Sequence, residues 1–120
     1  MNNYIISKIC ELPLDIKKGD KSSFQLAEES GFDNNNKERD KSAIKDYLNL
    51  HSSLINDWQM WSEDKRTSGG FYLIINKKNI VGSLDSNFKR NDKEFETPID
   101  ACSEYIYLEI SSILNLKVYE

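Results

Sequence analysis

Hydrophobic residues recur at helical spacing along most of the chain, and strand-like alternation is concentrated near its middle. In the first segment, Ile5, Ile9 and Leu12 form a stripe that fits one face of a helix. Pro13 would close this helix. We therefore predict a helix over residues 4–14, with a short strand as the alternative.

A second, shorter helix is predicted over residues 22–30, after a polar loop at residues 15–21. Ser22 or Ser23 has the chemistry of an N-cap, because a serine hydroxyl accepts a hydrogen bond from a free amide of the first turn. Gly31 then supplies the residue that most easily adopts the left-handed conformation at a helix end.

Two further helices are predicted over about residues 41–50 and 53–65, where apolar side chains fall three or four positions apart. The preceding tract, residues 33–41, contains three consecutive asparagines among charges and is predicted to be an exposed loop. His51 lies on the apolar stripe and is interpreted as a core or boundary residue. Trp58 is interpreted as a core residue.

A β-hairpin is predicted over residues 71–84, with strands 71–75 and 80–84 joined by a turn at residues 76–79. An isolated hairpin is marginally stable, so a third strand is expected, and residues 93–96 are the best candidate. The first strand, FYLII, is apolar on both of its alternating faces. This pattern predicts cover on both faces, by helices or by another molecule.

The last helix has the clearest start signal, with Thr97 as the N-cap and Asp100 placed to reach back to it. We predict that it extends to about residue 114. Glu104 and Glu109 are expected to face outward. One face would carry the apolar side chains Ile99, Cys102, Ile106, Ile110 and Ile113.

The predicted fold class is α+β, with residues 1–120 forming a single small domain. About four to five helices would pack on a short antiparallel sheet of two to three strands, the hairpin 71–84 and the strand 93–96. No apolar run approaches the length of a transmembrane helix, and the first residues lack the pattern of a secretory signal. We therefore expect a cytoplasmic protein, with Cys10 and Cys102 as buried free thiols.

The formal net charge of −4 argues against binding to a nucleic-acid backbone, which requires clustered lysine and arginine. Mild acidity is compatible with solubility alone and with docking onto a basic partner.

Catalytic patterns lack the partners that their chemistry needs. The chain has a single histidine, His51, so a histidine-based metal site or a Ser-His pair is not expected. Ser62 and Lys65 match an S-x-x-K pattern, but its companion motifs are missing. Gly69-Gly70 does not have the spacing of a phosphate loop. We expect no enzyme activity and no catalytic, cofactor or metal site.

The string W-x-x-W-S-E-D-K-R-T-S-G-G-F-Y at residues 58–72 is the most distinctive part of the chain. Together with Val81-Gly82, the TPIDACSEYI segment at 97–106 and FQLAEESGF at 24–32, it resembles a family of small bacterial immunity proteins. These proteins are associated with contact-dependent growth inhibition and related polymorphic toxins. The resemblance covers most of the chain.

The resemblance implies a cytosolic protein that binds and neutralises one cognate toxin C-terminal domain, expected to be a basic nuclease, without catalysis of its own. The alternative is a general protein-protein adaptor or a chaperone-like binding module. The shared motif is then scaffold, and exposed aromatic and acidic groups around it are the partner-binding candidates. These are Trp61, Glu63, Asp64, Arg66, Tyr72, Asp85, Glu94 and Glu96.

Overall fold

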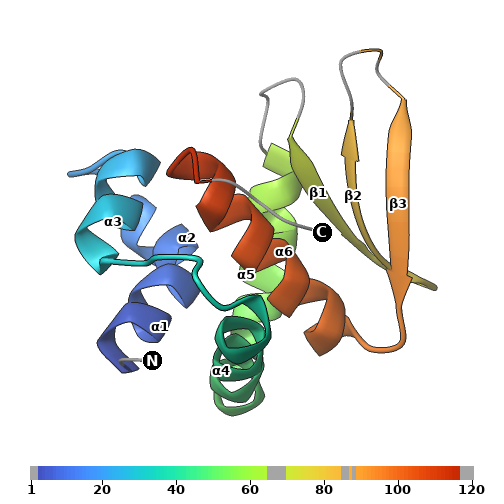
Figure 1. Ribbon diagram of the computed structural model, residues 1–120, viewed down its shortest axis with the longest axis horizontal. Helices are drawn as coiled ribbons and strands as arrows, with labels where there is room; N and C mark the ends of the chain where they lie inside the picture. The colour runs from blue at the N-terminus through green and yellow to red at the C-terminus, as the bar shows by residue number, and fades with distance from the viewer. Residues whose placement is uncertain (1–2, 65–69, 85–86, 88, 117–120) are drawn as a thin grey trace.

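The chain folds as an α+β domain in which all the helices lie to one side of a three-stranded sheet (Figure 1). The computed structural model describes residues 3–64, 70–84, 87 and 89–116. The described elements are α1 (Asn3–Cys10), α2 (Leu12–Ile16), α3 (Ser23–Ser30), α4 (Lys37–Leu50), α5 (Ser53–Asp64), β1 (Phe71–Ile75), β2 (Asn79–Leu84), β3 (Arg90–Phe95) and α6 (Pro98–Ile113). The predicted α+β class is confirmed.

The N-terminal segment forms two helices where the sequence pattern predicts one. The chain breaks at Glu11, and Pro13 lies in the first turn of α2 instead of closing α1. Proline fits there because its fixed φ suits a first turn, where its missing N–H is not needed. The helix α2 continues to Ile16, so the predicted loop at 15–21 begins two residues late.

Helix α4 begins inside the tract that was predicted to be a loop, residues 33–41. Asn36 is its N-cap and accepts a hydrogen bond from the Arg39 amide at 3.0 Å. A single asparagine in the polar tract therefore extends the helix by one turn. The predicted ends of α3 are confirmed, with Ser22 in a capping box and Gly31 left-handed at φ 78°.

The sheet is an antiparallel meander in the order β1-β2-β3, with Leu73 opposite Val81 and Val81 opposite Lys93. The predicted hairpin is confirmed. The predicted third strand at 93–96 is shifted, because β3 begins at Arg90 and ends at Phe95. Helix α6 packs against all three strands, and α5 lies along β1.

Helix α6 is the centre of the domain, and every residue from Ala101 to Ser111 is buried. The prediction that Glu104 and Glu109 face outward is therefore wrong. Helix α4 covers one side of α6, and its Lys41 and Lys37 amino groups lie 2.6 and 3.1 Å from the Glu104 carboxylate. A helix enclosed on all sides has no solvent face on which to leave a charge, so each carboxylate is paired internally.

Burial would raise the pKa of Glu104, but the hydrogen bonds and charges of Lys41 and Lys37 outweigh it and hold this pKa below its usual range. The Glu104 side chain is 5% exposed, while the side chains of Lys41 and Lys37 are 27% and 28% exposed. Both lysines can therefore place their stems on apolar surface and their amino groups on the buried acid.

The two tryptophans of α5 are fastened by hydrogen bonds to different elements. Trp58 is fully buried, as predicted, and its indole N–H donates to the Cys10 carbonyl at 2.7 Å. Trp61 is half-buried, and its indole N–H donates to the Glu109 carboxylate at 2.9 Å. Together they join α5 to the end of α1 and to α6.

Burial decides two smaller predictions, and the length and apolar character of the helices decide a third. Cys10 and Cys102 are buried free thiols, as expected. His51 is exposed at the C-cap of α4, stacked on the Tyr47 ring at a centroid distance of 4.3 Å, and does not belong to the core. None of the described helices combines the length and the apolar character needed to cross a bilayer.

Asp40 on α4 carries a fully buried carboxylate with few partners. Among the described residues, neither oxygen has a hydrogen-bond partner of good geometry, and the Arg39 Nε lies 3.5 Å from Oδ1. Burial raises the pKa of Asp40, and the charge of Arg39 only partly opposes this.

We therefore predict that Asp40→Asn raises the free energy of unfolding at neutral pH by about 1 kcal/mol. The pKa of Asp40 is higher in the folded protein than in the unfolded chain, so the charged carboxylate opposes folding at pH values above both pKa values. The penalty disappears below the unfolded pKa of about 3.9, and the gain should vanish there. Urea unfolding at neutral and acidic pH tests this, with the exposed Asp46→Asn on the same helix as the control. A gain of equal size at both pH values would contradict it.

Candidate functional site

The face of the sheet that points away from α6 is uncovered in the described structure. Of the helices, only α5 and α6 make substantial contact with the strands, and α6 takes the face that carries Leu73 and Val81 (Figure 1). We call the other face the outer sheet face. It presents the side chains of Tyr72, Ile74, Ile80, Arg90, Asp92 and Glu94.

Within the described residues, the prediction that FYLII is covered on both faces is therefore met on one face only. Phe71 and Ile75 pack against the core together with Leu73. Tyr72 and Ile74 do not join that core and remain half-buried. Ile74 lies directly opposite Ile80, so the outer sheet face has an aliphatic centre.

Tyr72 lies across the sheet, and Gly82 makes this possible. The register places Gly82 between Tyr72 on β1 and Asp92 on β3. A Cβ atom at position 82 would collide with the Tyr72 ring and with the Asp92 carboxylate. Because glycine leaves this space open, the phenol reaches over β2 and donates a hydrogen bond to Asp92.

Arg90 completes this cluster. Its Nε donates to the Tyr72 hydroxyl at 3.0 Å, and its Nη2 lies 3.1 Å from the Asp92 carboxylate. The guanidinium carbon is 5.1 Å from the centroid of the Tyr72 ring, in cation–π range. Burial and the hydrogen bond to Asp92 raise the pKa of Tyr72, so the phenol is protonated at neutral pH and available as a donor.

The C-terminal end of α5 brings acidic groups to the border of this face. Glu63 and Asp64 are both exposed there. A shallow hollow of about 360 Å³ is lined by Glu63 together with Tyr72, Ile74 and Arg90. Glu63 therefore borders the uncovered aromatic and aliphatic surface.

The structure brings together only some of the residues predicted to bind a partner. Glu63 and Tyr72 line the same hollow, and Glu94 lies on the same sheet face, opposite Ile80. Glu96 is exposed just beyond β3.

Of the other predicted residues, Trp61 and Asp64 are described, and neither lines this hollow. Trp61 is turned inward to Glu109. Arg66 and Asp85 lie outside the described residues, as do Lys65 and Gly69.

Four residues of the outer sheet face were not predicted. Ile74 and Ile80 lie at alternate positions of strands that were predicted, and their two-sided apolar pattern was the available signal. Arg90 and Asp92 precede the third strand predicted at residues 93–96, so they were not expected on the sheet. Their pairing with Tyr72 depends on the register of β3, which the sequence does not specify.

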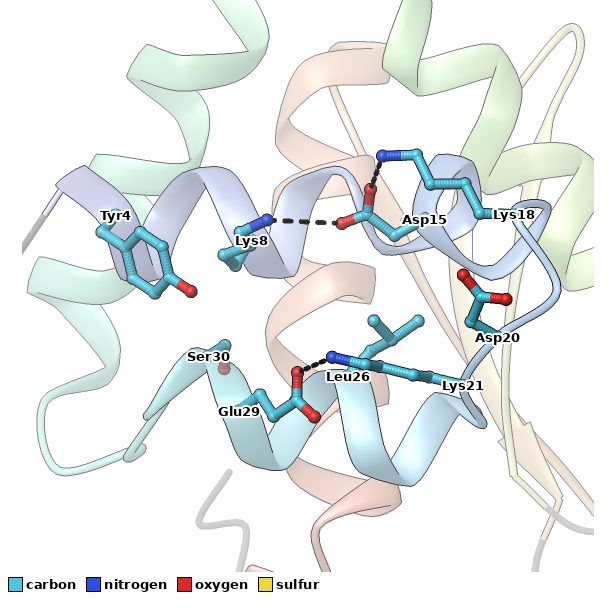
Figure 2. A pocket seen from close by; sticks show the side chains of 9 residues that line it. All are labelled: Tyr4, Lys8, Asp15, Lys18, Asp20, Lys21, Leu26, Glu29 and Ser30. Atoms are coloured by element: carbon cyan, nitrogen blue, oxygen red, sulfur yellow. Dashed lines mark hydrogen bonds and ion pairs between the residues drawn. The ribbon is translucent and has the colours of Figure 1, made fainter.

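The pocket between α1, α2 and α3, of about 220 Å³, is lined by both lysines and acids (Figure 2). Lys18 and Lys8 lie 3.2 and 4.0 Å from Asp15, and Lys21 lies 2.6 Å from Glu29. All three lysines have carboxylate partners, and with Asp20 the lining holds as many acids as lysines, so the formal charges of the pocket sum to zero.

A groove of about 520 Å³ between α1 and α4 is largely apolar and is lined by Tyr4, Tyr47 and Leu50, among others. Tyr4 is 54% exposed and Leu50 81% exposed. This groove is separate from the outer sheet face, because α1 and α4 make little contact with the strands.

Ser62, the serine of the S-x-x-K pattern, has a structural task. Its hydroxyl oxygen accepts a hydrogen bond from the Leu73 amide at 2.8 Å. Among the described residues, no group of histidine, cysteine and acidic side chains is placed to hold a metal ion.

Comparison with known protein families, with curated proteins and with solved structures finds no match to this chain. The evidence on function is therefore the surface of the protein together with the sequence resemblance.

Proposed function

We propose that this protein is an immunity protein, which binds one cognate toxin domain and neutralises it by covering its active site or substrate surface. The observation that carries the proposal is the uncovered outer sheet face. A strand as apolar as β1 is normally covered on both sides, and among the described residues only the side facing α6 is covered. A partner protein would supply the cover of the other side.

The charge around this surface supports a basic partner. Among the described residues, Glu63 and Glu94 are exposed there, and Arg90 is already paired with Asp92. An inhibitor of a nuclease benefits from carboxylates at the positions where the toxin binds phosphates. The proposed compartment is the cytoplasm, where a delivered toxin would act.

The shared W-x-x-W-S motif is consistent with a scaffold role. Trp58, Trp61 and Ser62 each make a hydrogen bond within the protein, to α1, α6 and β1 respectively. Specificity for one toxin would then reside in neighbouring exposed groups that differ from protein to protein.

Co-expression tests the proposal directly. The proposal predicts that the gene immediately upstream encodes a toxin, and the C-terminal domain of that gene's product is produced in cells with or without this protein. We expect growth to be rescued and the two chains to co-purify as a tight complex. Absence of both rescue and complex would refute the immunity function. Moderate binding to several unrelated proteins, without rescue, would favour the adaptor alternative.

A further inference from the structure

We infer that the outer sheet face is the docking surface for a basic segment of the partner protein, with Tyr72 as its preset anchor. The inference rests on the proposed function and adds to it the surface and the kind of segment that binds there.

Tyr72 has the properties of an interface anchor. Tyrosine and arginine are enriched among residues that dominate binding energy, and here they are adjacent. The hydroxyl of Tyr72 is bonded to Asp92 and Arg90, and Gly82 leaves room for the ring to lie on the sheet. A side chain already fixed in one orientation loses little conformational entropy on binding.

The surroundings of Tyr72 select the partner's chemistry. Ile74 and Ile80 provide an apolar patch beside the ring, and the carboxylates of Glu63 and Glu94 border it on α5 and β3. Arg90 does not offset them, because Asp92 lies 3.1 Å from its guanidinium. The matching segment carries an apolar side chain flanked by lysine or arginine.

The edges of the sheet are less suited to binding than its face. On the open edge of β1, the Leu73 amide donates to Ser62, and the Ile75 carbonyl accepts from Gln59 at 3.0 Å. These side chains of α5 occupy the groups that an added strand would need. On the other edge, β3 has the sequence RNDKEF, whose charges disfavour pairing with another strand.

The test uses a catalytically inactivated C-terminal domain of the toxin encoded by the adjacent upstream gene as the probe. Dissociation constants are measured by calorimetry at low and high salt. Tyr72→Ala is expected to weaken binding about thirtyfold or more. Glu94→Lys is expected to weaken it about tenfold at low salt and less at high salt. Glu28→Lys, an exposed acid on α3, is the matched control and should leave binding unchanged.

A second variant tests the preset orientation without removing the anchor. Gly82→Ala removes no side chain of the outer sheet face but displaces the Tyr72 ring and the Asp92 carboxylate, because the new methyl group would occupy their positions. Binding should weaken about tenfold while thermal unfolding shows a folded protein. Tyr72→Phe, which keeps the ring and loses its two hydrogen bonds, should lie between Gly82→Ala and the wild type.

The outcomes separate the surface from the function. If the wild type binds and the Tyr72, Gly82 and Glu94 variants bind equally well, the immunity function stands and the docking surface is refuted. Loss of binding in Leu50→Glu alone would move the surface to the α1–α4 groove and refute the inference in the same way. If the wild type does not bind the probe, the proposed function and the docking surface fail together.

Discussion

Trp58→Ala is expected to lower the free energy of unfolding by about 4 kcal/mol, the largest effect of any single substitution considered in this protein. Trp58 is fully buried, and its ring makes an edge contact with Tyr105 at a centroid distance of 6.0 Å. Truncation leaves a cavity between α5 and α6. It also leaves the Cys10 carbonyl without the indole donor that now lies 2.7 Å away.

This loss is a large part of the stability of an ordinary domain, about 5–15 kcal/mol, so the alanine variant could unfold at room temperature. Trp58→Phe keeps the effect measurable. It fills most of the cavity and loses the N–H donor, so we expect a cost of about 1–2 kcal/mol. Met60→Ala, an exposed change on the same helix, should cost less than about 0.5 kcal/mol. Urea unfolding followed by circular dichroism measures all three. Equal costs at positions 58 and 60 would contradict the assigned packing.

Glu104→Ala is expected to lower the free energy of unfolding by about 3 kcal/mol. The substitution leaves the amino groups of Lys37 and Lys41 next to each other without the carboxylate that both now contact at 3.1 and 2.6 Å. The lysines are partly exposed and can turn toward water, which keeps the cost at the lower end for a broken buried ion pair. Glu104→Gln retains the shape and should cost less.

The effect of Glu104 depends on pH in a definite direction. Its folded pKa is lowered, so its stabilising contribution is complete above the unfolded value of about 4.3 and is lost as the pH falls through the lowered folded pKa. The difference in stability between the wild type and Glu104→Gln should therefore shrink in acid. Exposed Glu28→Gln is the control and should show little difference at any pH. A difference for Glu104→Gln that is constant with pH would exclude the ion pairs as its cause.

The elements could be predicted where a local signal marks them. Thr97 accepts a hydrogen bond from the Asp100 amide at 3.1 Å, as the sequence of this N-cap suggested. Gly31 closes α3 in the left-handed conformation, again as its residue type predicted. Such signals act over three or four residues, so one sequence is enough to detect them.

The errors arose where distant elements decide the outcome. Glu104 and Glu109 look like solvent-facing positions of α6, but both are buried because other helices supply Lys37, Lys41 and Trp61. The sequence of α6 and of its neighbouring residues contains no signal that indicates these partners. The same holds for the candidate site, where Tyr72 was predicted but its contacts with Arg90 and Asp92 depend on strand register.

The central position of α6 has a consequence for how the chain folds. Five helices and the whole sheet precede α6 in the described chain, yet α1, α3, α4, α5 and all three strands pack against it. Until α6 leaves the ribosome, these segments have no common surface on which to bury their apolar side chains. The α1–α3 and α1–α4 contacts and the strand pairs do not involve α6, but the shared core of the helices and the sheet can be completed only after α6 has been synthesised.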